Sequence, residues 1–472
     1  FSFSASPALA SVPPWSAPVT VADAYGDAKA SAVAPDGTIT IATETAAGIA
    51  TVTSTDAGAT WAPAVLVGSG GEFAFRPAIG VTSSGLLAAS WVEETAGVRA
   101  IYVVISANNG AIWSAPVALP TVISSVDDPV VASSSASGFT IAWSEGFDKL
   151  ASSSVDAGVT WSAAQVLTQA MNSYGTTSLI PHGVGQIVVI FQEFDGLTAL
   201  YSIQSKRSSD GGVSWGAIVP VSGSWSGSLG NGLYAVGVSP SAGNVVAVWS
   251  RGVIGGDGLF ATTSSDGGAT WDSPFSVFSP ADSLRYFDVQ EISATSAGVV
   301  WHYELGADSV LGYSTVDIGA SAASAPVTIN HTLTSYYDRL PSLSTLDSVR
   351  VVSWYEDGAT EATSGYRVSA SCDAGVTWTA PSALAIGPDI SSASAVTVVS
   401  GSVFTGLWGE QDSGPSGQSL RAASSSDPCA AVAAANPMLA TTGVEITPLV
   451  IFALAMFSLG AGLHALRRRS AV

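Results

Sequence analysis

Lysine is scarce in this chain of 472 residues, where only Lys29, Lys149 and Lys206 occur. Lysine and arginine together number 15 against 36 acidic residues, and the formal net charge is −21. A surface this acidic repels phosphate backbones, so we expect no nucleic-acid partner. Small cations and neutral or cationic glycans are electrostatically easier ligands, although the same acidity would also serve simply to keep an extracellular protein soluble.

Histidine is rare as well, and its few positions are scattered along the chain: His182, His302, His331 and His464. This spacing excludes a zinc constellation built on histidine. No glycine-rich phosphate loop stands between a strand and a helix. We therefore expect no metal and no cofactor.

Helical periodicity is absent until the last thirty residues. Glycine, serine, threonine, valine and alanine dominate the sequence, and tryptophan recurs at regular places. This composition is typical of an all-β protein with tight turns.

A repeated octet organises the sequence. SSDGGATW at 264–271 recurs, with small variations, at intervals of 48 to 56 residues. The aligned acidic or amide positions are Asp56, Asn108, Asp156, Asp210, Asp266, Asp317 and Asp373. Periods of this size indicate a propeller or a solenoid, in which each repeat is one supersecondary unit.

A second repeated feature gives the number of units. An aromatic residue followed two places on by glutamate precedes most octets, as in Trp91-Val92-Glu93 and Trp143-Ser144-Glu145. The position that this glutamate occupies recurs eight times along the sequence, and Arg251 stands there once. The eighth octet stops at Ser425-Ser426-Asp427, and the segment that should follow it stands at the N-terminus, at 15–19. We predict eight four-stranded blades closed by the N-terminal strand. Seven blades is the alternative, if the weak unit around Asp317 merges with its neighbours.

The octet fits the tight turn between the third and fourth strands of a blade. Its aspartate can accept hydrogen bonds from the main chain of the turn, and its glycine allows a positive φ. Tryptophan can pack between neighbouring sheets. One carboxylate in each loop is too few for a calcium site. We therefore interpret the octets as structural.

The octet Ser-x-Asp-x-Gly-x-Thr-Trp resembles the Asp-box, or BNR repeat, of sialidase-like β-propellers. The resemblance covers residues from about 12 to 428 and implies the propeller fold. It is less specific for sialidase activity, because Asp-box propellers include binding domains and other enzymes.

The C-terminus carries an uncharged apolar run at 448–466, which as a helix would span roughly 28 Å. Arg467, Arg468 and Arg469 follow it, which predicts a cytoplasmic C-terminal end with everything before the run outside. The motif just ahead of the run consists of Leu439, Ala440, Thr441, Thr442 and Gly443.

Motif, apolar run and basic tail together resemble a Gram-positive cell-wall sorting signal of the Leu-Ala-x-Thr-Gly kind found in actinobacteria. The resemblance implies sortase cleavage after Thr442 and attachment to a peptidoglycan precursor. Ala440 in place of proline leaves the sortase class open, and an uncleaved membrane anchor is the alternative.

The N-terminal segment 1–10 ends in Ala8-Leu9-Ala10, which is similar to the end of a signal peptide. An ordinary N-terminal segment is the alternative. The predicted organisation is a signal-peptide remnant at 1–10, an Asp-box propeller at 11–428, a short linker at 429–438 and a sorting signal at 439–472. We expect an extracellular protein anchored to the cell wall, or held in the membrane if it is uncleaved.

Strand direction indicates where a functional site should lie. The octets occupy third turns, so the glutamates at the ends of second strands lie at the opposite face. The residues that open the innermost strands share that face near the axis: Asp27, Arg76, Asp128, Tyr234, Asp288 and Arg339. The predicted ligand-face residues are Glu93, Glu145, Glu193, Tyr337 and Asp288. A glutamate that recurs in seven units can equally serve each time to satisfy main-chain groups of a loop.

The candidates for catalysis, should there be any, are Arg76, Arg251, Arg339, Asp128, Glu304 and Glu356. Arginines suit carboxylate recognition because the guanidinium group binds it in bidentate fashion. The sialidase resemblance implies three arginines, a Tyr–Glu nucleophile pair and an aspartate acid/base. Phe75-Arg76-Pro77 and Arg339-Leu340-Pro341 resemble the family's Arg-Ile-Pro motif, but neither starting point completes the set.

The leading interpretation is therefore a surface module that binds extracellular glycan or protein on the face opposite the octets. A sialidase-like exo-glycoside hydrolase is the alternative, and a mainly structural wall protein is a third. Cys372 and Cys429 occupy corresponding turns of neighbouring units, so a disulfide between them is predicted, with two free thiols as the alternative.

Overall fold

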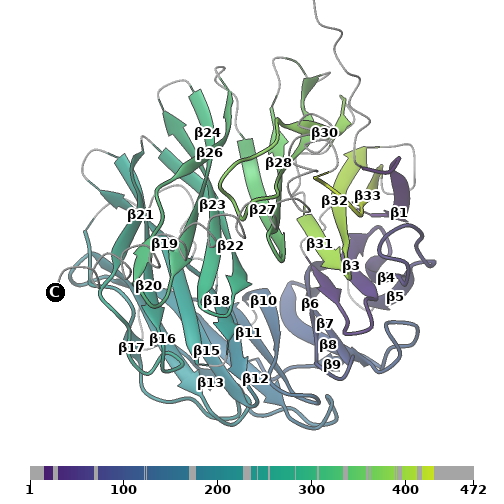
Figure 1. Cartoon of the computed structure of the whole chain (residues 1–472). Coiled ribbons are helices and arrows are strands. Elements are labelled where there is room, and N and C mark those ends of the chain that lie inside the picture. The colour runs from purple at the N-terminus through teal and green to yellow at the C-terminus, as the bar shows by residue number, and fades with distance from the viewer. Residues whose placement is uncertain are drawn as a thin grey trace, which may run out of the picture. The chain divides into compact units, whose positions relative to one another are not determined.

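The computed structural model describes residues 15–429 except 25–29, 69–72, 122, 124, 169–176, 227–234, 242, 254–255, 282, 306–307, 333–337, 358–359, 361–362, 388–389, 391–395 and 412–416. Trp15–Ser426 forms one unit, and all its strands belong to eight antiparallel sheets that we number as blades 1 to 8 (Figure 1). The all-β class is confirmed.

The innermost strands of the blades line the axis of the unit. Each contacts the innermost strand of the next blade, and β31 contacts β2, so the eight strands form a closed ring. In order they are β2 (Ser31–Val33), β6 (Phe73–Val81), β10 (Val126–Ser133), β14 (Ser178–Gly183), β18 (Ala235–Ser241), β22 (Ser283–Ser293), β27 (Asp338–Leu346) and β31 (Val396–Ser400).

The second strands are the most apolar part of each blade. Tryptophan in six of them is at most 1% exposed, and Phe191 takes the same role in blade 4. These rings belong to clusters that span neighbouring sheets, as Trp301 shares one cluster with Val246 of the preceding blade. Full burial of such a side chain contributes roughly 1.5–3 kcal/mol. The strands are β3 (Ile39–Thr45), β7 (Leu87–Thr95), β11 (Phe139–Glu145), β15 (Gln186–Asp195), β19 (Asn244–Val253), β23 (Ser296–Leu305), β28 (Val349–Glu356) and β32 (Val403–Gln411).

The third strands run back from the second strands and end at the octets. They are β4 (Gly48–Ser54), β8 (Val98–Ser106), β12 (Asp148–Ser154), β16 (Leu200–Ser208), β20 (Gly256–Ser264), β24 (Asp308–Asp317), β29 (Gly365–Ser371) and β33 (Gln418–Ser425). The fourth strands are mostly short: β5 (Val65–Gly68), β9 (Val117–Ala118), β13 (Gln165–Val166), β17 (Val219–Pro220), β21 (Phe275–Ala281), β25 (Ala322–Ala323) and β30 (Ser382–Ile386). In blade 6, β26 (Val327–Thr332) also pairs with β24.

The fourth strand of blade 8 comes from the other end of the chain. It is β1 (Val19–Asp23), which pairs antiparallel with β33, so the purple and yellow ends of the colour scale meet in one sheet (Figure 1). The prediction of eight blades closed by the N-terminal strand is confirmed, and the seven-blade alternative is wrong. The unit around Asp317 forms a blade of its own, because β22 to β25 make a complete sheet.

The octet turns have the internal hydrogen bonds that their sequence predicts. In blade 1, the Ser54 hydroxyl donates to Asp56 Oδ1 over 2.8 Å, and the N–H of Thr60 donates to the same oxygen over 2.8 Å. The Thr60 hydroxyl donates to Oδ2 over 2.6 Å. These bonds from Thr60 hold the pKa of Asp56 below its usual value. Equivalent bonds form around Asp156, Asp210, Asp266 and Asp373.

Two further sequence predictions concern the end of the chain. Cys372 and Cys429 are both disulfide-bonded, and no described cysteine is free. The apolar run at 448–466 and the sorting motif at 439–443 lie outside the described residues. In the part of the chain that is described, no helix has the length and apolar character needed to cross a membrane.

Candidate functional site

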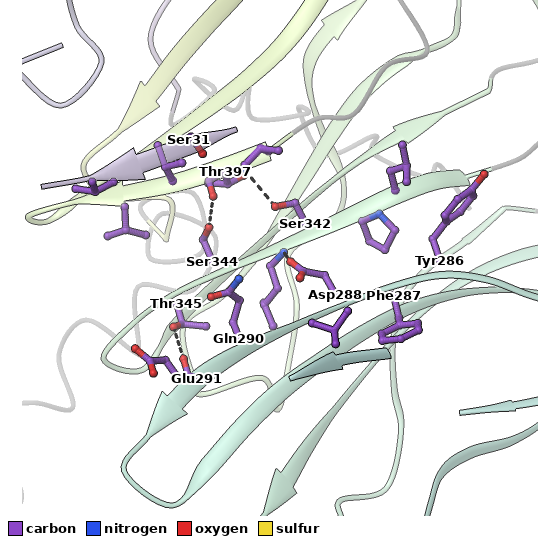
Figure 2. A pocket seen from close by; sticks show the side chains of 18 residues that line it. Ser31, Tyr286, Phe287, Asp288, Gln290, Glu291, Ser342, Ser344, Thr345 and Thr397 are labelled. Atoms are coloured by element: carbon purple, nitrogen blue, oxygen red, sulfur yellow. Dashed lines mark hydrogen bonds between the residues drawn. The ribbon is translucent and has the colours of Figure 1, made fainter. Parts of the chain in front are cut away.

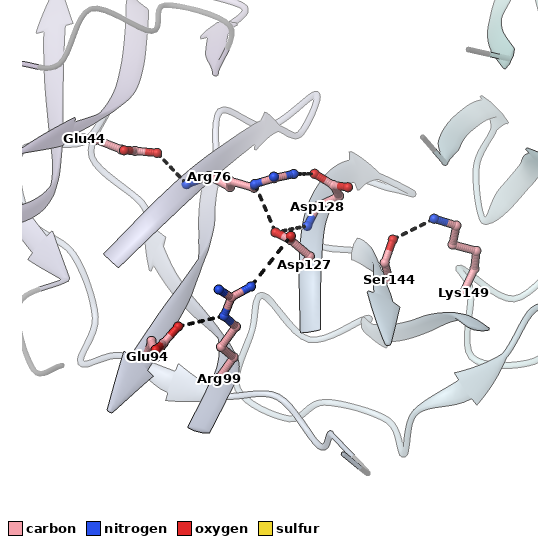
Figure 3. A network of polar contacts seen from close by, with 8 residues as sticks. All are labelled: Glu44, Arg76, Glu94, Arg99, Asp127, Asp128, Ser144 and Lys149. Atoms are coloured by element: carbon pink, nitrogen blue, oxygen red, sulfur yellow. Dashed lines mark hydrogen bonds and ion pairs between the residues drawn. The ribbon is translucent and has the colours of Figure 1, made fainter. Parts of the chain in front are cut away.

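The end of the propeller opposite the octets, which we call the charged face, carries Arg76, Asp128 and the glutamates at the ends of the second strands. There the second strands end, and the first strands begin. Figure 3 shows one group on this face, a network of side chains from blades 1 to 3. It contains Arg76 and Asp128, two of the predicted site residues, and joins them directly.

Arg76 is clamped between two carboxylates of the next blade (Figure 3). Its Nε lies 3.1 Å from Asp127 Oδ1, and its Nη1 donates to Asp128 Oδ1. Its main-chain N–H donates to Glu44 Oε1 of the preceding blade over 2.7 Å. The Arg76 side chain is still 50% exposed. The guanidinium group is thus fixed in direction while one side of it remains open to solvent.

The backbone at these two positions is unusual in the same way. Arg76 has a φ of 54° and Asp128 a φ of 50°, a region that non-glycine residues seldom adopt. Each precedes a proline, and the pairing register of its strand shifts there, between Phe75 and Ala78 and between Asp127 and Val130. Such bulges redirect side chains and are frequent next to functional sites. Here they turn Arg76 and Asp128 toward each other.

Arg99 extends the network along blade 2. Its Nε lies 2.8 Å from Glu94 Oε2, and its Nη1 lies 3.9 Å from Asp127 Oδ2. The guanidinium carbon stands 5.0 Å from the ring centroid of Phe75, within range of a cation–π contact. Two arginines therefore share Asp127, one from each side.

Lys149 is the buried cation of the network. Its side chain is only 2% exposed, and its Nζ donates to the Ser144 hydroxyl over 2.6 Å. Burial lowers the pKa of Lys149 to about 8, although Asp128 and Asp127 oppose this shift. The Lys149 ammonium group therefore offsets part of the negative charge of Asp127 and Asp128.

Three of the recurrent glutamates, Glu44, Glu93 and Glu145, hold local structure. Glu145 is 4% exposed, and its carboxylate accepts from the Trp143 indole over 3.0 Å and from the N–H of Ile123. Glu93 is 7% exposed and accepts from the Trp91 indole over 3.0 Å. Glu44 accepts in the same way from the N–H of Arg76. These glutamates therefore bind tryptophan indoles and main-chain N–H groups of their own or the next blade.

The other candidates are spread around the charged face. Arg251 stacks on Phe260, with 4.2 Å from its guanidinium carbon to the ring centroid. Glu356 is paired with Arg367 at 3.2 Å. Glu304 and Glu193 lie in second strands opposite Ser309 and Ser202. The structure brings none of these four into the network of Figure 3.

Four predicted residues lie wholly or partly outside the described residues. Arg339 of β27 pairs with Tyr355 of β28, and the Arg339 side chain lies outside the described residues. Tyr337, Asp27 and Tyr234 also lie outside them. For the described part of the chain, the three-arginine arrangement that the sialidase resemblance implies is therefore not assembled.

A cavity of about 610 Å³ runs along the innermost strands. Figure 2 shows hydroxyl and amide side chains along its wall. Asp288 and Glu291 are the charged residues among its described lining, and no lysine or arginine joins them there. The polar lining is Ser31, Tyr286, Asp288, Gln290, Glu291, Ser342, Ser344, Thr345 and Thr397.

Asp288 is fixed between two blades in this cavity. One carboxylate oxygen accepts from the N–H of Val289 over 2.8 Å, and the other accepts from the N–H of Leu343 in blade 7 over 2.8 Å. Burial raises the pKa of Asp288 to about 6, although these two bonds oppose the shift. The prediction that Asp288 opens its strand is wrong. β22 begins at Ser283, so Asp288 lies in the middle of the strand and faces the axis.

Exposed apolar side chains also lie on the charged face. They belong to the turns and strand starts of blades 2 to 4. Their exposed fractions are 65% for Phe73, 57% for Val98, 48% for Ile123, 58% for Phe147 and 84% for Leu197. Ile123 and Phe147 are close in space, since a Cβ on Gly146 would stand 3.1 Å from the Ile123 side chain. Fixed polar groups and exposed apolar surface on one face are typical of ligand sites.

Sequence reasoning missed most of this network: Asp127, Arg99, Glu94, Lys149 and Ser144. A signal was present in two cases. Asp127 precedes Asp128 directly, and Lys149 is one of only three lysines in the chain. No group of three or more histidine, cysteine or acidic residues suited to a metal occurs within the described residues.

No protein-family model and no curated protein matches the sequence. Several solved structures are similar in fold. An ulvan lyase bound to a GlcA–Rha3S saccharide is 10% identical, with a TM-score of 0.47 over 79% of this chain and 96% of that one. The polysaccharide lyase Uly1 is 10% identical, with a TM-score of 0.49 over 76% of this chain and 90% of that one. The NanB sialidase from Streptococcus pneumoniae is 14% identical, with a TM-score of 0.39 over 73% of this chain and 67% of that one. At these identities the likeness concerns the fold alone.

Proposed function

We propose that this chain is an extracellular propeller that binds glycan on the charged face, over blades 1 to 4. The observation that carries the proposal is the clamp of Arg76 between Asp127 and Asp128, which is half exposed and lies on a face that also exposes apolar side chains. The clamp offers fixed donors and acceptors, and turns and strand starts of the same face expose rings such as Phe73 and Phe147. A sugar has hydroxyl groups to pair with the first and C–H surfaces to pack on the second.

The charge balance of the network favours a neutral ligand over an acidic one. Arg76 and Arg99 already face Asp127, Asp128 and Glu94, and Lys149 adds a cation that interacts with the two aspartates. A ligand carboxylate that approached Arg76 would have to displace an intramolecular carboxylate and would lie close to a second one. Such like-charge contacts disfavour anions. Hydroxyl groups meet no such penalty.

The test is a glycan array, followed by calorimetry with the best ligand and residues 11–438. Arg76→Gln and Phe147→Ala should each weaken binding by at least tenfold, since each removes a central contact. The matched control is Arg367→Gln, which breaks an ion pair of the same kind in blade 7. Binding that Arg76→Gln leaves unchanged would contradict the proposal. If the charged face bound a protein and no glycan, the proposal of a glycan ligand would be wrong.

Asp288 favours a second candidate function, a sialidase-like exo-glycoside hydrolase. A carboxyl group whose pKa is about 6 and which lines a cavity of about 610 Å³ could act as a proton donor near neutral pH. The same purified protein should be screened against fluorogenic sialosides and other glycosides. Turnover that Asp288→Asn abolishes, with the fold retained, would establish this alternative and displace the binding proposal.

We further propose that the octets are Asp-boxes and that residues 439–472 attach the propeller to the wall. Leu439 to Gly443, the apolar run at 448–466 and the three arginines after it support this proposal. In a Gram-positive host with a matching sortase, the protein should be released from the wall fraction by muramidase. Thr442→Ala should leave it in the membrane fraction. Equal release of both proteins would rule out sortase attachment.

A further inference from the structure

A small cavity lies behind the octet of blade 4, at the opposite end of the propeller from the charged face. It measures about 380 Å³ and is lined by Arg207, Ser208, Ser209, Ser214, Trp215 and Gly216. Arg207 directly precedes the octet, and Gly216 directly follows it. This pair of positions distinguishes blade 4 from the others.

The position before the octet is small or uncharged in every other blade, where Thr53, Ile105, Ser153, Thr263, Ser314, Ala370 and Ser424 stand. In blade 4 it is an arginine. The Nε of Arg207 is buried and has no hydrogen-bond partner among the described residues. Burial lowers the pKa of His182, and the positive charge of Arg207 lowers it further. A second basic side chain therefore lies near Arg207 and does not neutralise its charge.

The position after the octet supplies an acceptor in several blades. In blade 2 the Ser114 hydroxyl accepts from the N–H of Ile105 over 3.0 Å, and in blade 3 the Ser162 hydroxyl accepts from the N–H of Ser153 over 3.0 Å. Thr379 does the same in blade 7 for Ala370. Gly216 has no side chain and brings no such oxygen to the N–H of Arg207.

Blade 5 shows that this position accommodates a carboxylate. Asp272 follows the octet there, and its Oδ2 accepts from the hydroxyl of Thr263, the residue before the octet, over 2.7 Å. Ser321 of blade 6 donates to the same oxygen over 2.7 Å. The fold can therefore hold a negatively charged oxygen at this place. In blade 4 the cation is present, and the described part of the chain places no carboxylate on it.

The acidic group nearest in sequence is already engaged. Asp210 accepts from the Ser208 hydroxyl over 2.8 Å, from the N–H of Ser214 over 2.9 Å and from the Ser214 hydroxyl over 2.5 Å. The Nζ of Lys206 donates to the carbonyl of Val166 in the neighbouring blade. Within the described residues, none of the ion pairs involves Arg207.

We propose that the cavity beside Arg207 binds an oxyanion, the carboxylate or sulfate group of a ligand, in the place that Asp272 fills in blade 5. The guanidinium group and the main-chain N–H of Arg207 donate to the anion, and Ser209 lines the same cavity. The site is separate from the glycan site proposed above, because octets and charged face lie at opposite strand ends. A single arginine with one N–H supports a dissociation constant on the order of 1–10 mM.

The test follows the indole N–H resonance of Trp215 in protein labelled with ¹⁵N-tryptophan. Sodium sulfate and sodium glucuronate are titrated separately against sodium chloride at equal ionic strength, with glucose as the neutral control. We expect a saturable shift of Trp215 with one or both anions. The indole of Trp161 in blade 3, where the residue before the octet is Ser153, should follow the chloride reference.

Three variants decide the result. Arg207→Gln should abolish the saturable shift. Gly216→Asp should abolish it too, because it supplies the missing carboxylate within the chain. Gly216→Ala is the matched control and should retain it, since an added Cβ meets only the Arg207 carbonyl oxygen at 3.5 Å. The unchanged resonances of the other tryptophans report that each variant is folded. Equal responses of Trp215 and Trp161, or a shift that survives Arg207→Gln, would overturn the proposal.

Discussion

Thr405 donates its hydroxyl proton to the main-chain carbonyl of Ala57 over 2.8 Å, across 348 positions of the sequence. Ala57 belongs to the octet of blade 1, and Thr405 lies in the second strand of blade 8. The Ser424 hydroxyl donates to the same carbonyl over 3.1 Å. The first octet therefore links blade 1 to blade 8 through hydrogen bonds, in addition to the pairing of β1 with β33.

The glycine after Ala57 should be sensitive to substitution. Gly58 has a φ of 84°, and a Cβ there would stand 2.5 Å from Thr405 Cγ2. Gly58→Ala should lower the free energy of unfolding by roughly 2–4 kcal/mol, because it combines backbone strain with overpacking. Gly85→Ala is the control, with a φ of 88° and no atom within 4 Å. It should cost only about 1 kcal/mol. Urea unfolding of the two variants measures the difference, and equal losses would contradict it.

The octet aspartates should make the fold sensitive to acid. Hydrogen bonds from Thr160, first its hydroxyl and then its N–H, lower the pKa of Asp156 to about 2. A group whose pKa is lower in the folded state stabilises the fold above its unfolded pKa of about 3.9 and loses that contribution as the pH falls toward about 2. The urea midpoint should therefore fall between about pH 4 and pH 2. Asp156→Asn, which introduces the amide that Asn108 provides in blade 2, should show a smaller fall. An identical pH profile in both proteins would contradict this account.

Asp288 should act in the opposite direction. Burial raises its pKa to about 6, so its protonated form is favoured in the folded state. The stability that it contributes is complete below its unfolded pKa of about 3.9 and is lost as the pH rises through about 6. Relative to Asp288→Asn, the wild-type protein should therefore lose stability between about pH 4 and pH 7. Thermal unfolding of both proteins across this range measures the difference. A constant difference would mean that the carboxyl group does not titrate there.

The predicted disulfide between Cys372 and Cys429 closes a loop of about 57 residues. A crosslink over such a loop stabilises a fold by roughly 4 kcal/mol in the chain-entropy model. Cys372→Ser with Cys429→Ser should therefore lower the melting temperature, as should a reducing agent with the wild-type protein. Peptide mapping without reduction should recover the two cysteines in one linked fragment. Two separate fragments would contradict the pairing.

The repeat made the architecture predictable. The spacing of Asp56 to Asp373 and the split eighth octet are enough to predict the blade number and the closing strand, because each period encodes one sheet. The repeat also predicts that Arg76 and Asp128 lie on the same face of neighbouring blades, since both stand near the start of innermost strands. Their direct contact depends on two bulges before prolines, which the order of the strands does not imply.

The exceptions to the repeat were harder to predict. Arg99 and Lys149 join the network through side-chain directions and packing between blades, and neither has a counterpart in the repeated pattern. Asp288 was misplaced because β22 starts five residues earlier than the spacing suggested. Arg207 and Gly216 flank an octet that is itself regular. What sets blade 4 apart is therefore the residues on either side of the motif, which differ from their equivalents in the other blades.

Closure by β1 also sets an order of events during the export that we propose. β1 (Val19–Asp23) leaves the ribosome and crosses the membrane early, while its partner β33 (Gln418–Ser425) emerges about 400 residues later. Seven blades can pair their strands locally as the chain appears, but the eighth must wait for both ends. Contacts between such distant segments form slowly. Until then one strand edge stays open to chaperones and proteases outside the cell, so the whole propeller must be exported before it is protected.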